Sequence, residues 1–183
     1  MTVIAACKKD GKVCIGSDSL VVTDGEKALH MRKITKFNHF MVGIAGEYKF
    51  HQILEEMNKD IEAIKSIPEA RKFAKLVYSA YKEDCEHDDD VVKEVVFLIA
   101  TPEAIYEVDS YFCCLERQDI AAIGTGANYA KAAMQIVLKQ EIETDPFDIV
   151  RMGIDSAAHF CVDCGLPSYV FEVKKESPPR RKK

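Results

Sequence analysis

The sequence predicts an α+β fold, a four-layer αββα sandwich in which two mostly antiparallel sheets lie between two layers of helices. Three observations support this class. The expected elements come in blocks (strands, two helices, strands, two helices, a last strand), and blocks favour packed layers over an alternating parallel sheet. Tight turn signals join neighbouring strands, which makes the sheets mostly antiparallel. The strands are apolar throughout, as expected where both faces are covered.

The first block of strands starts at the amino terminus. Its β-rich runs cover residues 2–9, 12–18, 32–37 and 40–45. Asp10-Gly11 joins the first two runs and is a strong signal for a two-residue hairpin. Asn38-His39 is the turn candidate between the other two. Residues 20–31 should form a short excursion around Asp24-Gly25.

Two helices are predicted next. In residues 48–64 apolar side chains recur at helical spacing and define one face, formed by Phe50, Ile53, Leu54, Met57 and Ile61. Pro68 fits the first turn of the second helix. An acidic loop at residues 83–90 ends this helical pair.

The second half repeats the order of strands followed by helices. Strands are expected at residues 94–100, 104–108, 111–115 and 120–123, and a last one at 168–173. A third helix should begin after Gly124-Thr125-Gly126 and run to about Gln140. A fourth should begin after Asp145-Pro146 and continue to Cys164-Gly165, where glycine is a natural helix stop.

The length of 183 residues suits one domain, which we place at residues 1–173. Residues 174–183 carry a basic run and Pro178-Pro179 without apolar periodicity, so they are expected to form a charged, flexible tail. The net charge of −5 argues against a nucleic-acid partner, because phosphate binding needs a concentrated basic face. No segment approaches the ~20 apolar residues of a membrane span.

The sequence gives no reason to expect a cofactor. Cys161 and Cys164 have C-x-x-C spacing, but no second pair completes a zinc set, and the histidines show no paired metal spacing. A cation on the 87–90 acidic run is less favoured than a solvated loop. The odd number of cysteines and the lack of a signal-peptide pattern favour a reducing cytoplasm.

The amino terminus offers a nucleophile. Thr2 is small enough for removal of Met1 by an aminopeptidase, which would leave threonine with a free α-amine. Such an amine, with an ordinary pKa of about 8, can act as the base for its own hydroxyl. Many proteins begin Met-Thr, so the pair alone carries no inference.

The surrounding segments supply the missing context. Thr2-Val3-Ile4, the Asp10-Gly11 turn and Ile15-Gly16-Ser17-Asp18 follow one another, and Lys33-Ile34 comes later. Further segments are Val42-Gly43-Ile44-Ala45-Gly46 and Ile123-Gly124-Thr125-Gly126. In order and spacing these segments resemble those of proteasome β subunits and HslV, which are N-terminal nucleophile hydrolases with a four-layer αββα fold. The resemblance spans nearly the whole domain.

The resemblance implies a threonine peptidase and a role for each matching residue. Thr2 would attack a peptide carbonyl to give an acyl-enzyme. Lys33 would lower the pKa of the Thr2 amine and hydroxyl, and Asp18 would hold the lysine charged and oriented. The Gly43 amide would stabilise the oxyanion.

Two further residues are expected to support the site. Thr125 replaces the family's usual serine and keeps its hydroxyl. Asp163 matches a further aspartate of the family, although the serine and glycine that should follow it are replaced or displaced, because Leu166 stands at the serine position and Gly165 comes early.

The resemblance also implies homo-oligomeric rings with protein or peptide substrates, fed by an ATP-dependent unfoldase. Two alternatives stay open. One is a non-catalytic ring or scaffold subunit, which retention of Met1 would favour. The other is an amidase of the same superfamily acting on a small molecule, which would have an open pocket and no large ring.

Overall fold

The computed structural model describes residues 2–23, 26–28, 31–85, 94–140 and 143–174. One sheet has four antiparallel strands in the order β10-β1-β2-β11. Their bounds are Ile120–Ile123 (β10), Ile4–Lys9 (β1), Lys12–Ser17 (β2) and Tyr169–Glu172 (β11). The β1–β2 hairpin turns at Asp10 and Gly11, whose φ angles of 51° and 74° are those that an Asp-Gly turn adopts. The predicted hairpin is confirmed.

The other large sheet has five antiparallel strands in the order β5-β6-β7-β8-β9. Their bounds are Ile34–Lys36 (β5), Met41–Ala45 (β6), Val96–Ala100 (β7), Ile105–Val108 (β8) and Cys114–Arg117 (β9). A small separate hairpin, β3 (Val21–Thr23) with β4 (Glu26–Ala28), forms the predicted excursion. Its turn at residues 24–25 lies outside the described residues.

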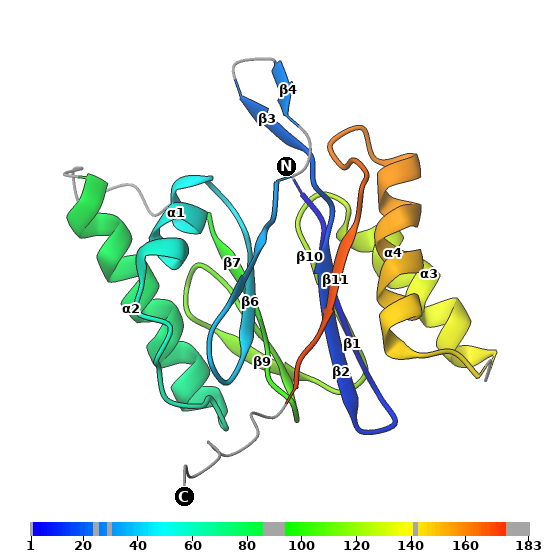
Figure 1. Ribbon diagram of the computed structural model, residues 1–183, viewed down its shortest axis with the longest axis horizontal. Helices are drawn as coiled ribbons and strands as arrows, with labels where there is room; N and C mark the ends of the chain where they lie inside the picture. The colour runs from blue at the N-terminus through cyan, green and yellow to red at the C-terminus, as the bar shows by residue number, and fades with distance from the viewer. Residues whose placement is uncertain (1, 24–25, 29–30, 86–93, 141–142, 175–183) are drawn as a thin grey trace, which may run out of the picture.

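Helices cover the outer face of each sheet (Figure 1). α1 (Lys49–Glu56) and α2 (Ile67–Cys85) lie on the five-stranded sheet. α3 (Ala127–Lys139) and α4 (Pro146–Phe160) lie on the four-stranded sheet. The fold is therefore the predicted four-layer αββα sandwich with antiparallel sheets.

Three apolar clusters fill the spaces between the four layers. The middle cluster joins the two sheets and includes Ile4, Ile15 and Leu98. The other two lie between each sheet and its own helices. Both faces of the central strands are thus buried, which explains why their sequences are apolar throughout.

Some predicted boundaries are wrong. The first helix ends at Glu56 instead of continuing to residue 64, because the Asn58 side chain accepts a hydrogen bond from the Asp60 amide and favours a turn there. Helix α4 ends at Phe160, before Cys164-Gly165. Strand β9 begins at Cys114, after a turn held by the Asp109 carboxylate.

The structure describes only part of the predicted acidic loop and of the predicted tail. Helix α2 reaches Cys85, so the first residues of the predicted acidic loop are helical, and residues 86–93 lie outside the described part. The predicted tail lies outside it from residue 175 onward. Within the described residues, no helix is long and apolar enough to cross a membrane.

Candidate active site

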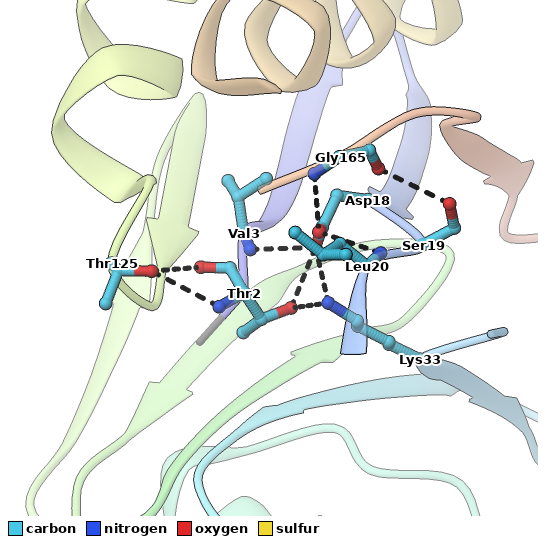
Figure 2. A network of polar contacts seen from close by, with 8 residues as sticks. All are labelled: Thr2, Val3, Asp18, Ser19, Leu20, Lys33, Thr125 and Gly165. Atoms are coloured by element: carbon cyan, nitrogen blue, oxygen red, sulfur yellow. Dashed lines mark hydrogen bonds and ion pairs between the residues drawn. The ribbon is translucent and has the colours of Figure 1, made fainter. Parts of the chain in front are cut away.

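Thr2 lies just before β1, at the edge of the space between the two sheets. Its side chain is 6% exposed and belongs to a polar network (Figure 2). The Lys33 ammonium donates a hydrogen bond of 2.7 Å to Thr2 Oγ1, and that hydroxyl donates one of 2.9 Å to Asp18 Oδ1. Lys33 also donates to the same carboxylate oxygen at 2.7 Å. Three residues far apart in sequence therefore meet at one hydroxyl.

The Asp18 carboxylate is held by backbone amides as well as by side chains. Its Oδ1 accepts from the Val3 amide at 3.0 Å, and its Oδ2 accepts from the amides of Leu20 and Gly165 at 3.2 and 3.1 Å. The Asp18 amide in turn donates to the Val3 carbonyl at 3.2 Å. Donors around both oxygens fix the position of the carboxylate at the end of β2.

Lys33 lies just before β5 and is buried, with a side chain that is 5% exposed. Burial lowers the pKa of the Lys33 ammonium, and the charge and hydrogen bond of Asp18 oppose this effect. The ammonium thus stays paired while its proton becomes easier to remove. A positive charge 2.7 Å from Oγ1 also favours the deprotonated form of the threonine hydroxyl.

Thr125 approaches the backbone of Thr2 from the loop between β10 and α3. Its Oγ1 accepts a hydrogen bond from the Thr2 nitrogen at 3.2 Å and donates one to the Thr2 carbonyl at 3.3 Å. Gly124 comes before it with a φ of 88°, and a Cβ there would lie 2.3 Å from the Thr2 carbonyl oxygen. Only glycine allows this close approach at that backbone angle.

The structure corrects the expectation for Gly43. This residue lies inside β6, paired with Ile34 on one side and Leu98 on the other, and a Cβ there would lie 2.5 Å from a methyl of Ile4. Gly43 is therefore part of the packing between the sheets and does not face Thr2. Gly46, just beyond the end of β6, is exposed and lines both cavities next to Thr2, so it replaces Gly43 as the candidate oxyanion amide.

Asp163 is not brought into the network. It lies in the turn after α4, and none of the hydrogen bonds described for the site involves it. The segment contributes through Gly165 instead, whose amide binds Asp18 and whose carbonyl accepts from the Ser19 amide at 2.9 Å. The displaced glycine noted in the sequence was the signal that this segment departs from the family pattern.

Two cavities meet at Thr2. The Lys33 cavity has a volume of about 220 Å³ and is lined by Thr2, Val21, Lys33, Ile44, Gly46, Glu47, Tyr48 and His51. The Thr125 cavity has a volume of about 600 Å³ and is lined by Thr2, Ala45, Gly46, Glu47, Glu94, Val96, Gly124 and Thr125. A peptide that reaches the Thr2 hydroxyl can therefore place side chains on either side of it.

Sequence reasoning missed Gly46 and Gly165 as candidates, although both stood in the segments that carried the resemblance. It also missed His51, which lines the Lys33 cavity from α1. A single histidine among apolar helix positions gives no signal of the direction in which it points. Among the described residues no group of three or more His, Cys, Asp or Glu could hold a metal ion.

Known proteins are similar to this chain in sequence and in fold, although no family model matches the sequence. A curated relative, "ATP-dependent protease subunit HslV" of Caldicellulosiruptor saccharolyticus, is 27% identical over 176 residues, which span 88% of this chain and 92% of the relative. The solved structure of Thiobacillus denitrificans BPH has a TM-score of 0.83 and 25% identity, covering 96% of this chain and 99% of that one. BPH in complex with epoxomicin matches equally well.

A more distant structure agrees on the fold. Eukaryotic HslV from Trypanosoma brucei has a TM-score of 0.68 and 20% identity, covering 93% of this chain and 98% of that one. The stacked antiparallel sheets between two helix layers match the N-terminal nucleophile hydrolase fold, and a threonine at the start of the first strand is hydrogen-bonded to a lysine and an aspartate. In sequence and in fold the chain is similar to the HslV-like, proteasome β-subunit group of these proteins.

Proposed function

We propose that this chain is an active threonine peptidase whose nucleophile is Thr2, exposed by removal of Met1. The observation that carries the proposal is the Thr2 hydroxyl, which accepts from the Lys33 ammonium at 2.7 Å and donates to Asp18 at 2.9 Å. A threonine hydroxyl is a weak nucleophile unless a base and a nearby cation activate it. The cation is Lys33, which lies within hydrogen-bonding distance of the hydroxyl, and the base is the α-amine that Thr2 itself carries once Met1 is removed.

The reaction begins with attack of Thr2 Oγ1 on a peptide carbonyl. The α-amine takes the hydroxyl proton, while Lys33 stabilises the developing alkoxide and Asp18 keeps Lys33 in place. Thr125 orients the amine, because its hydroxyl lies 3.2 Å from the Thr2 nitrogen. The Gly46 amide is the donor proposed for the oxyanion, a contribution of about 3 kcal/mol where such donors have been removed in other enzymes. The protonated α-amine then gives its proton to the peptide nitrogen as the C–N bond breaks and the amine product leaves. Water attacks the remaining ester, with the α-amine as base again, and the acyl group leaves as a carboxylic acid while Thr2 Oγ1 regains its proton.

Assembly into homo-oligomeric rings is part of the proposal. Helices α3 and α4 form an outer layer that leaves large apolar side chains exposed, among them Ile136 at 58% and Phe160 at 65%. Exposed apolar surface of this kind is typical of protein interfaces. The relative's name, an ATP-dependent protease subunit, supports an ATP-dependent unfoldase as the partner that delivers protein substrates. All seven cysteines are free, which agrees with the proposed cytoplasmic location.

Intact mass together with peptide hydrolysis tests the proposal. We expect the purified protein to lack Met1 and to cleave small peptide amides, with turnover abolished in Thr2→Ala and partly kept in Thr2→Ser, which retains a hydroxyl. Native mass measured on the same sample should show a ring. A protein that retains Met1 and cleaves nothing would instead be the non-catalytic ring subunit. Cleavage by a monomer, restricted to small amides, would point to the amidase.

A further inference from the structure

Cys161 and Cys164 lie in one tight turn directly after α4. The Cys164 amide donates a hydrogen bond of 3.1 Å to the Cys161 carbonyl, which is the pattern of a β-turn. The first and fourth Cα atoms of such a turn lie within ~7 Å of each other. Disulfides join residues whose Cα atoms are ~4.4–6.8 Å apart, so this backbone suits a disulfide between the two cysteines.

The two thiols are also in contact, and they differ in exposure. Burial and the nearby Asp18 carboxylate raise the pKa of the Cys164 thiol to about 12, and a hydrogen bond between its side chain and that of Cys161 adds to this shift. Both thiols are free, and Cys161 is partly exposed whereas Cys164 is buried. An oxidant from solvent therefore reaches Cys161 first, with Cys164 beside it as a neutral thiol.

This turn is connected to the proposed nucleophile by two short routes. Gly165, the residue after Cys164, donates its amide to Asp18 Oδ2 at 3.1 Å (Figure 2). The Cys164 sulfur lies against Gly126, where an added Cβ would be 2.6 Å from it. Gly126 in turn donates its amide to the Thr2 carbonyl at 3.2 Å. A shift of Cys164 therefore affects contacts of both Asp18 and Thr2.

We propose that Cys161 and Cys164 form a reversible disulfide that lowers the activity of Thr2 under oxidising conditions. Hydrogen-bonded sulfur atoms lie much further apart than the ~2 Å of a disulfide bond, so Cys164 must move toward Cys161 when the bond forms. This movement shifts Gly165 and weakens its hydrogen bond to Asp18. The effect on turnover rests on the proposed peptidase function, whereas formation of the disulfide does not.

A hydroperoxide is the class of oxidant with which the reaction balances. The Cys161 thiolate attacks one peroxide oxygen and becomes a sulfenic acid, while the O–O bond breaks and the other oxygen takes the proton of the Cys161 thiol and leaves as water or an alcohol. The Cys164 sulfur then attacks the Cys161 sulfur, so that the S–S bond forms, the S–O bond breaks, and the Cys164 proton leaves with the hydroxide as water. The thiol pair loses two electrons and the peroxide gains them. A dithiol reductant reverses the oxidation by thiol–disulfide exchange.

Treatment of the full-length protein with dilute hydrogen peroxide tests the proposal. Trypsin releases residues 152–174 as one fragment, which contains these two cysteines and no other. We expect this fragment to lose two hydrogens by mass after peroxide and to regain them with dithiothreitol. Turnover of a peptide amide should fall about tenfold or more in the oxidised protein, the effect of weakening a hydrogen bond to a charged group, and should recover with the reductant. An unchanged fragment mass would overturn the proposal, and so would a disulfide that leaves turnover unchanged in an active enzyme.

Two variants separate this pair from the other cysteines. Cys161→Ser removes the accessible partner, so it should keep the turnover of the reduced protein and lose the response to peroxide. Cys113→Ser removes a more exposed thiol just before β9 and should respond to peroxide as the wild type does. Inhibition of Cys161→Ser to the same extent as the wild type, or protection of Cys113→Ser, would overturn the assignment.

Hydrogen exchange keeps the inference testable if the chain proves inactive. The Gly165 amide, followed by mass spectrometry, should exchange about tenfold faster in the oxidised protein than in the reduced one, because its hydrogen bond to Asp18 is weakened. Equal exchange rates would overturn the link between the disulfide and Asp18. Faster exchange in a protein whose reduced form has no turnover would overturn only the peptidase function.

Discussion

Two sets of buried polar groups lie near Thr2, the Asp18–Lys33 pair and the His51 ring, and they differ in how many of their hydrogen bonds the protein itself supplies. Asp18 and Lys33 form a pair in which each charge has several partners, five of them donors to the carboxylate. His51 has one ring nitrogen without any partner in the described structure. The hydrogen bonds of the pair are thus complete in the free protein, whereas those of the His51 ring are not.

This difference separates a charge pair suited to chemistry from a buried ring that lowers stability. A preorganised charge pair reacts without rearrangement, so its full satisfaction favours turnover. A buried ring nitrogen without a hydrogen-bond partner costs stability. The following variants test that division, from the largest expected effect to the smallest.

Removal of the Lys33 charge should have the largest effect. Lys33→Met leaves the Asp18 carboxylate buried without its cation, and breaking a buried pair in this way costs about 3–5 kcal/mol. The free energy of unfolding, measured with urea, should fall by that amount, and turnover should fall to the level of Thr2→Ala.

Lys12→Met is the matched control, because the Lys12–Asp145 pair is equally short at 2.6 Å but is half exposed. Its loss should change the free energy of unfolding little, because solvent screens an exposed pair. Similar losses in both variants would contradict the importance of burial.

A side chain at Gly124 should damage the site through the Thr2 backbone. In Gly124→Ala the new Cβ would lie 2.3 Å from the Thr2 carbonyl oxygen, at a φ of 88°. Backbone strain and the displaced carbonyl together should cost about 2–4 kcal/mol in thermal or urea unfolding and most of the turnover.

Gly11→Ala measures the strain alone. Gly11 has a similar φ of 74°, but nothing lies within 4 Å of its added Cβ. This variant should lose about 1 kcal/mol and keep its activity. If Gly124→Ala is no worse than Gly11→Ala, the close contact with Thr2 does not constrain the nucleophile.

Acid should destabilise the protein partly through His51. The pKa of its imidazole falls from 6.5 in the unfolded chain to about 4 in the folded protein, chiefly because the ring is buried. Between these two values the unfolded state binds more protons, so stability decreases as the pH falls through this window. The contribution between pH 7 and pH 5 is about 2 kcal/mol.

His51→Phe isolates this contribution. The variant should lose about 2 kcal/mol less than the wild type when urea unfolding is compared at pH 7 and pH 5, because a phenyl ring does not titrate. At pH 7 it should be at least as stable as the wild type, since it removes an unpaired buried nitrogen. Parallel pH profiles for the two proteins would mean that His51 is not buried in the neutral form.

The layers of this fold follow from sequence pattern, because apolar runs, turn signals and helical spacing report directly on burial. The Asp10-Gly11 hairpin and the start of α2 at Ile67, one residue before Pro68, were predicted in this way. Strand register is different, since it depends on pairing between distant segments. The choice between Gly43 and Gly46 as the oxyanion donor shows this: both are glycines of one segment, and only the structure shows that Gly43 pairs within β6 while Gly46 lines the cavities at Thr2.

The residues of the candidate site also divide into those that the sequence could predict and those that it could not. Thr2, Asp18, Lys33 and Thr125 could be named because their order along the chain resembles that of a family, and the structure brings all four together. His51 could not, because its orientation depends on where α1 docks against the sheet. Helix boundaries set by side-chain turns, such as the one at Asn58, also escape an apolar pattern.

The smallest effect is expected at Thr125, which contacts the nucleophile only through its hydroxyl. Thr125→Val keeps the shape but removes the hydrogen bond to the Thr2 nitrogen, whose length of 3.2 Å indicates a modest contribution of about 1 kcal/mol. Because the residue is exposed, unfolding should change little, while kcat should fall about fivefold with KM nearly unchanged. Thr125→Ser retains the hydroxyl and should stay close to the wild type. A rise in KM at constant kcat in Thr125→Val would instead place this hydroxyl in substrate binding, because orientation of the amine affects only the chemical step.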